Sequence, residues 1–232
     1  MPFLYEPIGW TQKAVNMTSE TTNSANSGSS LINLYSKASS KWQSTVERLG
    51  YPAAYGELIA RSVSASQYSS LVNVLDVGAG TGTFTTALLQ SSVAVGRIDL
   101  LEPSPDMLAV AEHRIGPNAN RLRCFSGGIG SPQVNAGTYD IILCAHVIEH
   151  IDDVQAGLAW MKSRLTEQGV LLLAVSKPHW CTSLVRMRWG HAAYSPPSVE
   201  KLLLTAGFSQ IDSGPFSKGP PSRTSYGYTA RA

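Results

Sequence analysis

The feature that most constrains the fold is a glycine-rich turn that follows a short apolar run. Residues 71–77 (Leu-Val-Asn-Val-Leu-Asp-Val) have the composition of a strand that is buried on both faces of a parallel sheet. The run stops at Gly78, Gly80 and Gly82, which predicts a tight turn from the strand into a helix. Glycines there allow positive φ and bring no Cβ atom near a ligand, and a helix N-terminus presents unpaired N–H groups. The turn is therefore predicted to cradle a ligand.

The spacing of these glycines indicates which ligand is expected. The dinucleotide fingerprint G-x-G-x-x-G would require glycine at position 83, where Thr83 stands, so NAD is disfavoured. The pattern that begins at Asp76, D-x-G-x-G-x-G, resembles motif I of the class I S-adenosylmethionine (SAM) methyltransferases. In that family the loop holds the methionine and ribose end of SAM. The resemblance therefore implies a SAM-dependent methyltransferase that releases S-adenosylhomocysteine.

A second acidic residue, Glu102, supports the resemblance. It ends the next apolar run, residues 98–101, at a position from which a carboxylate can accept hydrogen bonds from both ribose hydroxyls. Met107 follows on the next helix, behind the expected cap Ser104, and the resemblance places such an apolar side chain against adenine. Packing in the core is the alternative role for Met107.

Adenine recognition departs from the family pattern. Many family members have an acidic residue after the third strand, whereas this chain has Phe125-Ser-Gly-Gly-Ile-Gly130. Backbone groups near Gly128 and Ile129, or the Ser126 hydroxyl, are expected to substitute. The full set of residues expected to hold the cofactor is Asp76, Gly78, Ala79, Gly80, Gly82, Glu102, Pro103, Met107, Gly128, Ile129, Ala145 and His146.

Strand-like and helix-like segments alternate beyond the glycine turn, which predicts right-handed crossovers and a parallel sheet. Strands are expected at 95–101, 121–125, 139–145 and 170–175, with helices at 104–115, 152–165 and 198–206. Two last strands, 208–211 and 226–230, have no helix between them and predict an antiparallel pair. The resemblance implies an α/β fold over about residues 70–231: a Rossmann-like seven-stranded sheet of order 3-2-1-4-5-7-6, strand 7 antiparallel, with helices on both faces.

The N-terminal part is expected to be organised differently. Residues 1–30 are predicted to be flexible, since residues 16–30 are small and polar and bury too little surface to offset the entropy of ordering. Residues 31–66 are predicted to form two cap helices of a methyltransferase domain that spans 31–232. Tyr35 and Trp42 are candidate substrate-binding lid residues, although aromatics at helical spacing also occur in cores.

The segment that follows the expected strand 139–145 ends in His146-Val-Ile-Glu-His150, an H-x-x-E-H pattern that on a helix would suit zinc. Zinc is rejected and no metal is expected, because the run leaves a buried strand and resembles the methyltransferase motif that closes over SAM. His146 is expected beside the sulfonium. His150 is expected either to act as a general base or to pair with Asp152 or Asp153.

Residues 176–195 form a long insertion that begins at the carboxyl end of the fifth expected strand, where open α/β sheets bind ligands. It is the predicted lid and acceptor pocket, and its aromatic content suggests an apolar or aromatic acceptor. Packing as a lid helix is the alternative. His179 joins His146 and His150 as a catalytic candidate, and the substrate-binding candidates here are Trp180, Arg188, Trp189, His191 and Tyr194.

Composition narrows the choice of partner. The net charge is +2 and 15% of residues are charged, so no nucleic-acid partner is expected. No signal peptide and no long apolar run is present, and the three cysteines, Cys124, Cys144 and Cys181, suit reduced thiols, so a cytoplasmic protein without a membrane partner is expected. A monomer or homodimer that methylates an oxygen or nitrogen of a small molecule is predicted. The alternatives are a protein or RNA methyltransferase and a non-catalytic SAM-binding or partner-binding module.

Overall fold

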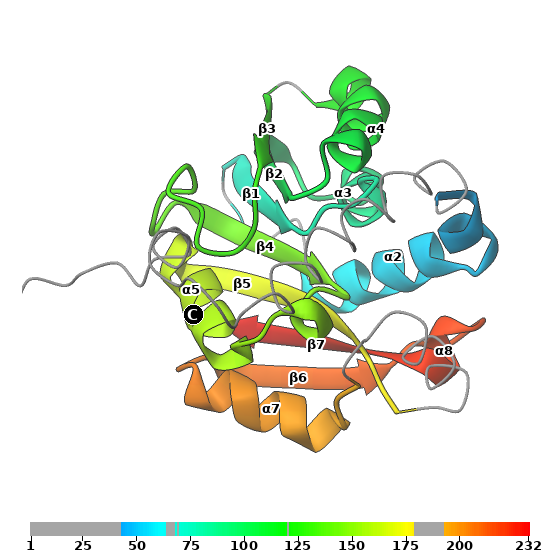
Figure 1. The fold of residues 1–232 in the computed structure, drawn as a ribbon, viewed down its shortest axis with the longest axis vertical. Helices are drawn as coiled ribbons and strands as arrows, with labels where there is room; N and C mark the ends of the chain where they lie inside the picture. The colour runs from blue at the N-terminus through cyan, green and yellow to red at the C-terminus, as the bar shows by residue number, and fades with distance from the viewer. Residues whose placement is uncertain (1–42, 64–67, 69, 120, 179–192) are drawn as a thin grey trace, which may run out of the picture.

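A seven-stranded sheet organises the computed structural model, which describes residues 43–63, 68, 70–119, 121–178 and 193–232 (Figure 1). The strand order is β3-β2-β1-β4-β5-β7-β6, and β7 runs antiparallel to both β5 and β6. This is the topology that the sequence predicts. The strands are β1 (Val72–Val77), β2 (Val95–Glu102), β3 (Leu122–Ser126), β4 (Tyr139–Ala145), β5 (Leu165–Ser176), β6 (Ser209–Pro215) and β7 (Ser225–Arg231).

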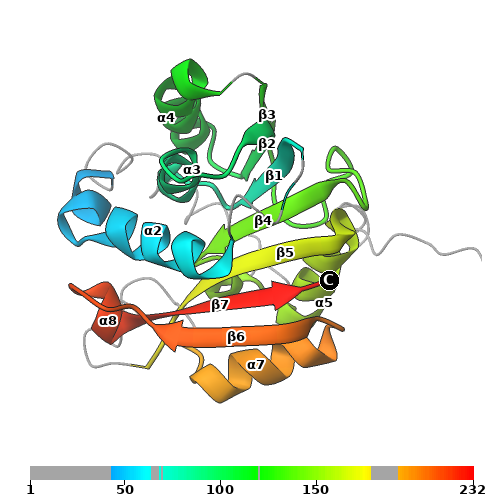
Figure 2. The same ribbon diagram turned by 180° about the vertical axis from the view of Figure 1, so that it is seen from behind.

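Helices pack against the sheet in two groups (Figures 1 and 2). One apolar core joins α2, α3 and α4 to Val72 and Val74 of β1. The other joins α5 and α7 to Leu75 and Val77 of the same strand, since alternate side chains of a strand point to opposite faces. The predicted coverage of both faces is confirmed. The helices are α2 (Tyr51–Ser62), α3 (Thr83–Leu89), α4 (Pro105–Ile115), α5 (Val154–Arg164), α7 (Pro196–Thr205) and α8 (Pro221–Thr224), with short 3-10 turns η3 (Gly116–Asn118) and η4 (Ile148–His150).

Two strand boundaries differ from the sequence prediction by more than one residue. The fifth strand begins at Leu165 rather than at residue 170, because Leu165 is extended, buried and paired with Tyr139 at the start of β4. The sixth strand continues to Pro215 because it pairs with β7 through a register shift, where Gln210 adopts a φ of 46°. Both extensions are set by pairing with a neighbouring strand, which a local pattern does not contain.

The N-terminal predictions are tested only in part. Residues 43–48 are helical and α2 matches the second predicted cap helix, whereas the predicted flexible segment 1–30 lies outside the described residues. Cys124 and Cys144 are free thiols, and Cys181 also lies outside. Within the described ranges, no helix is long and apolar enough to span a bilayer.

Candidate active site

The carboxyl ends of three neighbouring strands bring the sequence motifs together. Strand register places Val77 of β1 opposite Leu101 of β2 and Cys144 of β4. The glycine loop, Glu102 and Ala145 therefore leave the sheet at the same edge. Ligands of open α/β sheets bind beyond this edge, so it is the candidate site.

The three glycines of the loop have different neighbours. Their φ angles are 65° at Gly78, 54° at Gly80 and 76° at Gly82, all in the left-handed region. A Cβ on Gly78 would lie 2.3 Å from Val147 Cγ2, and a Cβ on Gly82 would lie 2.5 Å from Ile115 Cδ1. Among the described residues, a Cβ on Gly80 would meet nothing closer than the Met107 methyl group at 3.9 Å. Gly78 and Gly82 are thus required by packing, and Gly80 leaves room for a ligand.

Glu102 closes this loop from the neighbouring strand. One carboxylate oxygen accepts the Gly80 N–H and the other accepts the Ser104 N–H, each at 2.9 Å. Each oxygen keeps a further lone pair for a ligand hydroxyl. Burial raises the pKa of Glu102 above its usual value, and the two N–H groups oppose that rise. Glu102 therefore joins the loop to the N-terminus of α4 and keeps capacity to accept hydrogen bonds from a ligand.

Asp76 lies beneath the glycine loop and is 2% exposed. Its carboxylate accepts a hydrogen bond of 2.6 Å from the Thr85 hydroxyl of α3. Burial raises its pKa to about 7; the Thr85 hydrogen bonds oppose the rise and the nearby charge of Glu102 adds to it. A cation bound at this edge would favour the ionised form of Asp76.

The remaining cofactor candidates lie around the loop. Met107 is 4% exposed and lies in the first turn of α4, which Ser104 caps as predicted. Its methyl group would lie 3.9 Å from a Cβ built on Gly80. Ala79 is buried and Pro103 is exposed. The Gly127 N–H donates to the Glu102 carbonyl, so the turn that contains Gly128 and Ile129 starts beside Glu102.

His146 lies directly after β4 and is held in an unusual backbone conformation. Its φ is 57°, a region that costs a non-glycine residue about 1–2 kcal/mol. Its N–H donates to the Ala174 carbonyl at 2.8 Å, and its neighbour Val147 fills the space over Gly78. Strain of this kind persists where the surrounding structure requires it, and here it accompanies the packing of Val147 over Gly78 of the glycine loop.

A buried carboxylate and the end of β5 position the imidazole. His146 Nδ1 lies 3.3 Å from Glu149 Oε1 and 3.0 Å from Ser176 Oγ. The Ser176 N–H donates to the same Glu149 oxygen at 2.6 Å. Burial acts to raise the pKa of Glu149, but His146 and the Ser176 N–H outweigh it and the pKa lies below its usual value. Glu149 is therefore ionised near neutral pH.

Two buried atoms of this cluster have no hydrogen-bond partner among the described residues, namely His146 Nε2 and Glu149 Oε2. An ionised carboxylate only accepts, so its contact with Nδ1 favours the tautomer that carries hydrogen on Nδ1. Nε2 then presents a lone pair. Sequence reasoning recorded Glu149 only as part of the H-x-x-E-H pattern and missed Ser176 as a site residue. The i, i+3 spacing of His146 and Glu149 was the available signal.

The H-x-x-E-H residues lie at the end of β4 and in η4 rather than along a regular α-helix. No group of three or more histidine, cysteine or acidic residues suited to a metal occurs in the described ranges, and the predicted absence of a metal stays a prediction. Burial lowers the pKa of His150. Asp153, one of its two expected partners, accepts the Ala156 N–H and caps α5.

Most of the predicted acceptor residues lie outside the described ranges. Tyr194 is described, and its N–H donates to the Ser176 carbonyl at 3.2 Å. Both ends of the predicted acceptor insertion therefore meet at the end of β5, beside His146. The undescribed candidates are Tyr35, Trp42, His179, Trp180, Arg188, Trp189 and His191.

Aromatic residues of α2 reach both halves of the site, and sequence reasoning missed them in favour of Tyr35 and Trp42. The Tyr51 ring meets the His146 ring edge-on, with centroids 5.3 Å apart and an interplanar angle of 88°. Four residues later, Tyr55 stacks on Phe84 of α3 at 4.5 Å. The cap helix therefore contacts the imidazole and the helix that follows the glycine loop.

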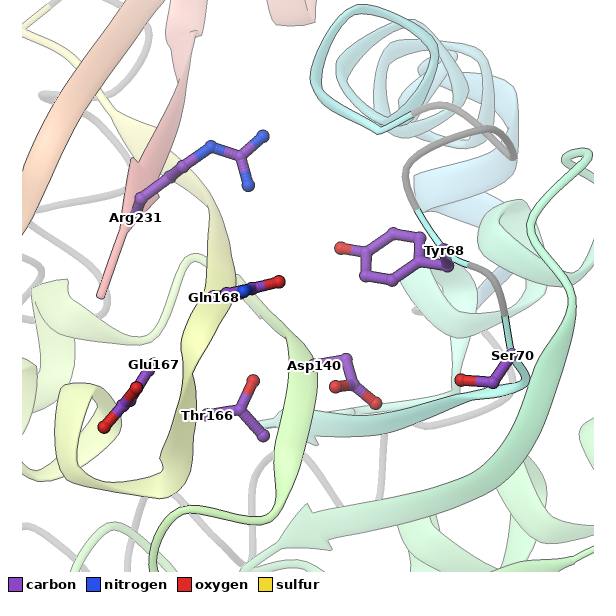
Figure 3. Close-up of a pocket in the computed structure, with 7 residues that line it drawn as sticks. All are labelled: Tyr68, Ser70, Asp140, Thr166, Glu167, Gln168 and Arg231. Atoms are coloured by element: carbon purple, nitrogen blue, oxygen red, sulfur yellow. The ribbon is translucent and has the colours of Figure 1, made fainter.

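A separate cavity of about 620 Å³ lies at the opposite edge of the sheet (Figure 3). Its lining combines Arg231 with the carboxylates of Asp140 and Glu167, so it favours neither sign of ligand charge, and none of the sequence motifs reaches it. The other lining residues are Tyr68, Ser70, Thr166 and Gln168.

The sheet order, the glycine loop and Glu102 at the end of β2 define the class I SAM-dependent methyltransferase fold. The chain belongs to the family described as "Methyltransferase domain", which it matches over residues 34–211.

Curated relatives include two O-methyltransferases. The chain is 32% identical over 108 residues to malonyl-[acyl-carrier protein] O-methyltransferase of Halalkalibacterium halodurans, a match of 45% of this chain and 39% of the relative. It is 26% identical over 105 residues to ubiquinone biosynthesis O-methyltransferase of Rickettsia felis, a match of 45% and 41%. The matched region thus spans less than half the length of these relatives.

Solved structures share the fold over a larger part of the chain. The 1,6-didemethyltoxoflavin-N1-methyltransferase of Burkholderia thailandensis, solved with 1,6-didemethyltoxoflavin and S-adenosylhomocysteine, is 17% identical with a TM-score of 0.66. The alignment covers 93% of this chain and 92% of that chain. At this identity the likeness shows the fold alone.

Proposed function

We propose that the protein is a SAM-dependent methyltransferase that methylates an oxygen or nitrogen of a small, apolar or aromatic molecule. One observation carries the proposal: among the described residues, the buried Nε2 of His146 has no hydrogen-bond partner, and the next residue, Val147, packs over Gly78 of the glycine loop. A general base near the methyl donor is what a hydroxyl or amine acceptor requires.

The residues at the glycine loop fit SAM. Gly80 leaves space in front of the loop, Met107 offers an apolar wall, and Glu102 keeps unused acceptor capacity. SAM supplies a methyl group on a positively charged sulfonium, which is already activated for in-line displacement. Asp76 and Glu102 would favour its cationic groups and hold the ribose hydroxyls, and Gly128 and Ile129 stay candidates for adenine recognition.

His146 would accept the proton that the acceptor loses as its methyl bond forms. The ionised Glu149 would hold Nδ1–H and stabilise the resulting imidazolium, while Ser176 would keep both side chains in place. The buried surroundings exclude water from the reacting groups. His150 and His179 stay alternative bases, and the 176–195 segment stays the proposed acceptor pocket.

Two observations support a small-molecule acceptor. Only 15% of the residues are charged and the net charge is +2, so the sequence predicts no large basic surface for nucleic acid. The matched relatives are named for malonyl-[acyl-carrier protein] and ubiquinone biosynthesis, so a carrier-bound acyl group is a second acceptor class to test.

The test is incubation of the purified protein with methyl-labelled SAM and an extract of its source cells, followed by separation of small molecules, protein and nucleic acid. Label in extractable small molecules that disappears with His146→Asn supports the proposal. Asparagine tolerates the left-handed backbone at this position and offers no comparable base.

Label in RNA, or label in protein that mild alkali does not release, would overturn the acceptor class and keep the enzyme class, whereas label that mild alkali releases from protein would indicate a carrier-bound acyl group. Calorimetry with SAM and with S-adenosylhomocysteine measures cofactor binding independently of turnover. Binding without label in any fraction, in extracts prepared under several growth conditions, would favour the non-catalytic module.

A further inference from the structure

Among the described residues, the hydrogen bonds of the His146 side chain involve only one atom of its ring, Nδ1. Glu149 and Ser176 both contact Nδ1, which fixes the direction of one ring atom. The ring turns about two side-chain torsions, and contacts at Nδ1 restrain these torsions without covering the faces of the ring. The position of Nε2, which has no partner among the described residues, therefore also depends on what packs against the rest of the ring.

Tyr51 provides that contact from a different part of the chain. Its ring lies at 88° to the imidazole with centroids 5.3 Å apart, an edge-to-face arrangement. Such pairs have a preferred orientation because a positive ring edge meets a negative ring face. The contact thus adds a restraint on the plane of the imidazole to those that the Cβ attachment and the Nδ1 contacts provide.

Tyr51 is itself anchored at its hydroxyl end. The hydroxyl oxygen lies 3.4 Å from both Thr224 Oγ1 and Ser225 Oγ, at the junction of α8 and β7. The Lys177 N–H donates to the Thr224 carbonyl at 2.9 Å, directly after Ser176. The junction of α8 and β7 therefore contacts both Tyr51, which packs on the imidazole, and Lys177, which directly follows the imidazole's partner Ser176.

We propose that Tyr51 is a positioning residue, which fixes the plane of the His146 imidazole so that Nε2 points at the methyl acceptor. The proposal rests on the proposed function for its catalytic consequence. Its structural part, the orientation of the ring, does not depend on which acceptor is methylated. The competing role is packing alone, in which Tyr51 only attaches α2 to the sheet.

Three variants separate these roles. Tyr51→Leu removes the aromatic ring and keeps an apolar side chain, while Tyr51→Phe keeps the ring and removes the hydroxyl. Tyr55→Phe is the matched control, because it makes the same chemical change one turn along α2 at a ring that stacks on Phe84. Each variant is first compared with the parent by circular dichroism and urea unfolding.

The first readout is NMR of the ring nitrogens and carbons of the five histidines, with His146→Asn used to assign the His146 signals. Tyr51→Leu is expected to shift and broaden the His146 ring signals because the ring samples several orientations, while Tyr51→Phe and Tyr55→Phe keep these signals sharp. Unchanged His146 signals in a folded Tyr51→Leu protein would overturn the proposal, whether or not any acceptor is known.

The second readout is steady-state kinetics with the acceptor that the labelling experiment identifies. Tyr51→Leu is expected to lower kcat by about 10- to 100-fold, the effect of misplacing a reacting group, with an unchanged Kd for SAM and an unchanged KM. Tyr51→Phe is expected to restore most of the rate. A loss carried by KM or by the SAM Kd would overturn the positioning role, and an inactive parent protein would refute the proposed function without affecting the NMR result.

If Tyr51→Leu does not fold, Tyr51→Trp keeps an aromatic edge but moves it. A shift of the His146 ring signals with the tautomer and kcat unchanged would then count against the proposal, because a moved edge should move Nε2.

Discussion

Glu149 Oε1 lies 3.3 Å from His146 Nδ1, and the Glu149 side chain is completely buried. The orientation of this pair fixes which imidazole nitrogen can act as a base. Glu149→Gln keeps an oxygen at the position that accepts the Ser176 N–H and faces Nδ1, but it removes the negative charge that would stabilise the imidazolium. We expect kcat to fall by about 100-fold or more, with an unchanged SAM Kd. Retention of the parent rate would show that this pair does not set the base.

The same substitution changes how stability depends on pH. The pKa of Glu149 in the folded protein lies below its ordinary value of 4.5, so ionised Glu149 stabilises the fold above pH 4.5. This stabilisation is lost as the pH falls through the lower folded pKa. We expect the free energy of unfolding of Glu149→Gln to fall less steeply with acid than that of the parent. Urea unfolding from about pH 3 to pH 7 measures both slopes, and equal slopes would contradict the prediction.

Gly50, which precedes α2, and two glycines of the glycine loop give a stability series in which backbone strain and packing separate. An alanine at Gly50 would meet no described atom within 4 Å at a φ of 86°, so only conformational strain of about 1–2 kcal/mol is expected. An alanine at Gly78 adds a 2.3 Å approach to Val147 Cγ2 and should cost about 2–5 kcal/mol in total. Chemical denaturation checks the order, and Val147→Ala should recover part of the Gly78→Ala loss.

Gly80 provides the functional member of that series. Among the described atoms, the one nearest to a Cβ on Gly80 would be Met107 Cε at 3.9 Å. Gly80→Ala should therefore destabilise the fold about as little as Gly50→Ala. The added methyl group would occupy the space in front of the loop. We therefore expect a folded protein with strongly weakened SAM binding by calorimetry. Parent affinity in Gly80→Ala would place the cofactor elsewhere.

Sequence and structure agree best where chemistry and periodicity coincide. The glycine spacing after residue 77 and the acidic residue at 102 indicated the fold family, the resemblance implied the sheet order, and the alternation of strands and helices predicted a largely parallel sheet. Both signals are local in sequence. The same locality explains the late start predicted for the fifth strand, because Leu165 continues the helical apolar pattern and becomes extended only by pairing with Tyr139.

The missed site residues are those whose role depends on long-range contacts. Ser176 contacts Glu149 from 27 residues away and has no distinguishing neighbours in sequence. Tyr51 reaches His146 from the cap helix, and one aromatic residue in a helix resembles another until the fold selects it. Even Glu102 differs from expectation in one respect, since both of its oxygens already accept backbone N–H groups. The sequence identified residue types suited to the chemistry, and tertiary structure determined which of them meet.

Asp76 predicts a pH dependence of cofactor binding. Its pKa is raised from 3.8 to about 7, so the folded protein binds more protons than the unfolded chain between these values and stability falls as the pH rises through them. Cationic SAM favours ionised Asp76 and should release its proton. We expect SAM affinity to increase by up to about tenfold between pH 6 and pH 8. Asp76→Asn should abolish this dependence, whereas Glu167→Gln at the opposite edge should keep it; a flat parent profile would contradict the assignment.

Glu102 allows ribose binding to be separated from loop structure. Glu102→Ala removes the acceptor for the Gly80 and Ser104 N–H groups, so it should lower stability, and it should also weaken SAM binding by about 1–3 kcal/mol. Ser104→Ala removes the cap that accepts the Met107 N–H and should cost about 1 kcal/mol of stability. SAM affinity in Ser104→Ala should stay near that of the parent. If both variants lose affinity in proportion to their loss of stability, Glu102 acts through the loop, whereas a loss specific to Glu102→Ala assigns it to the ribose.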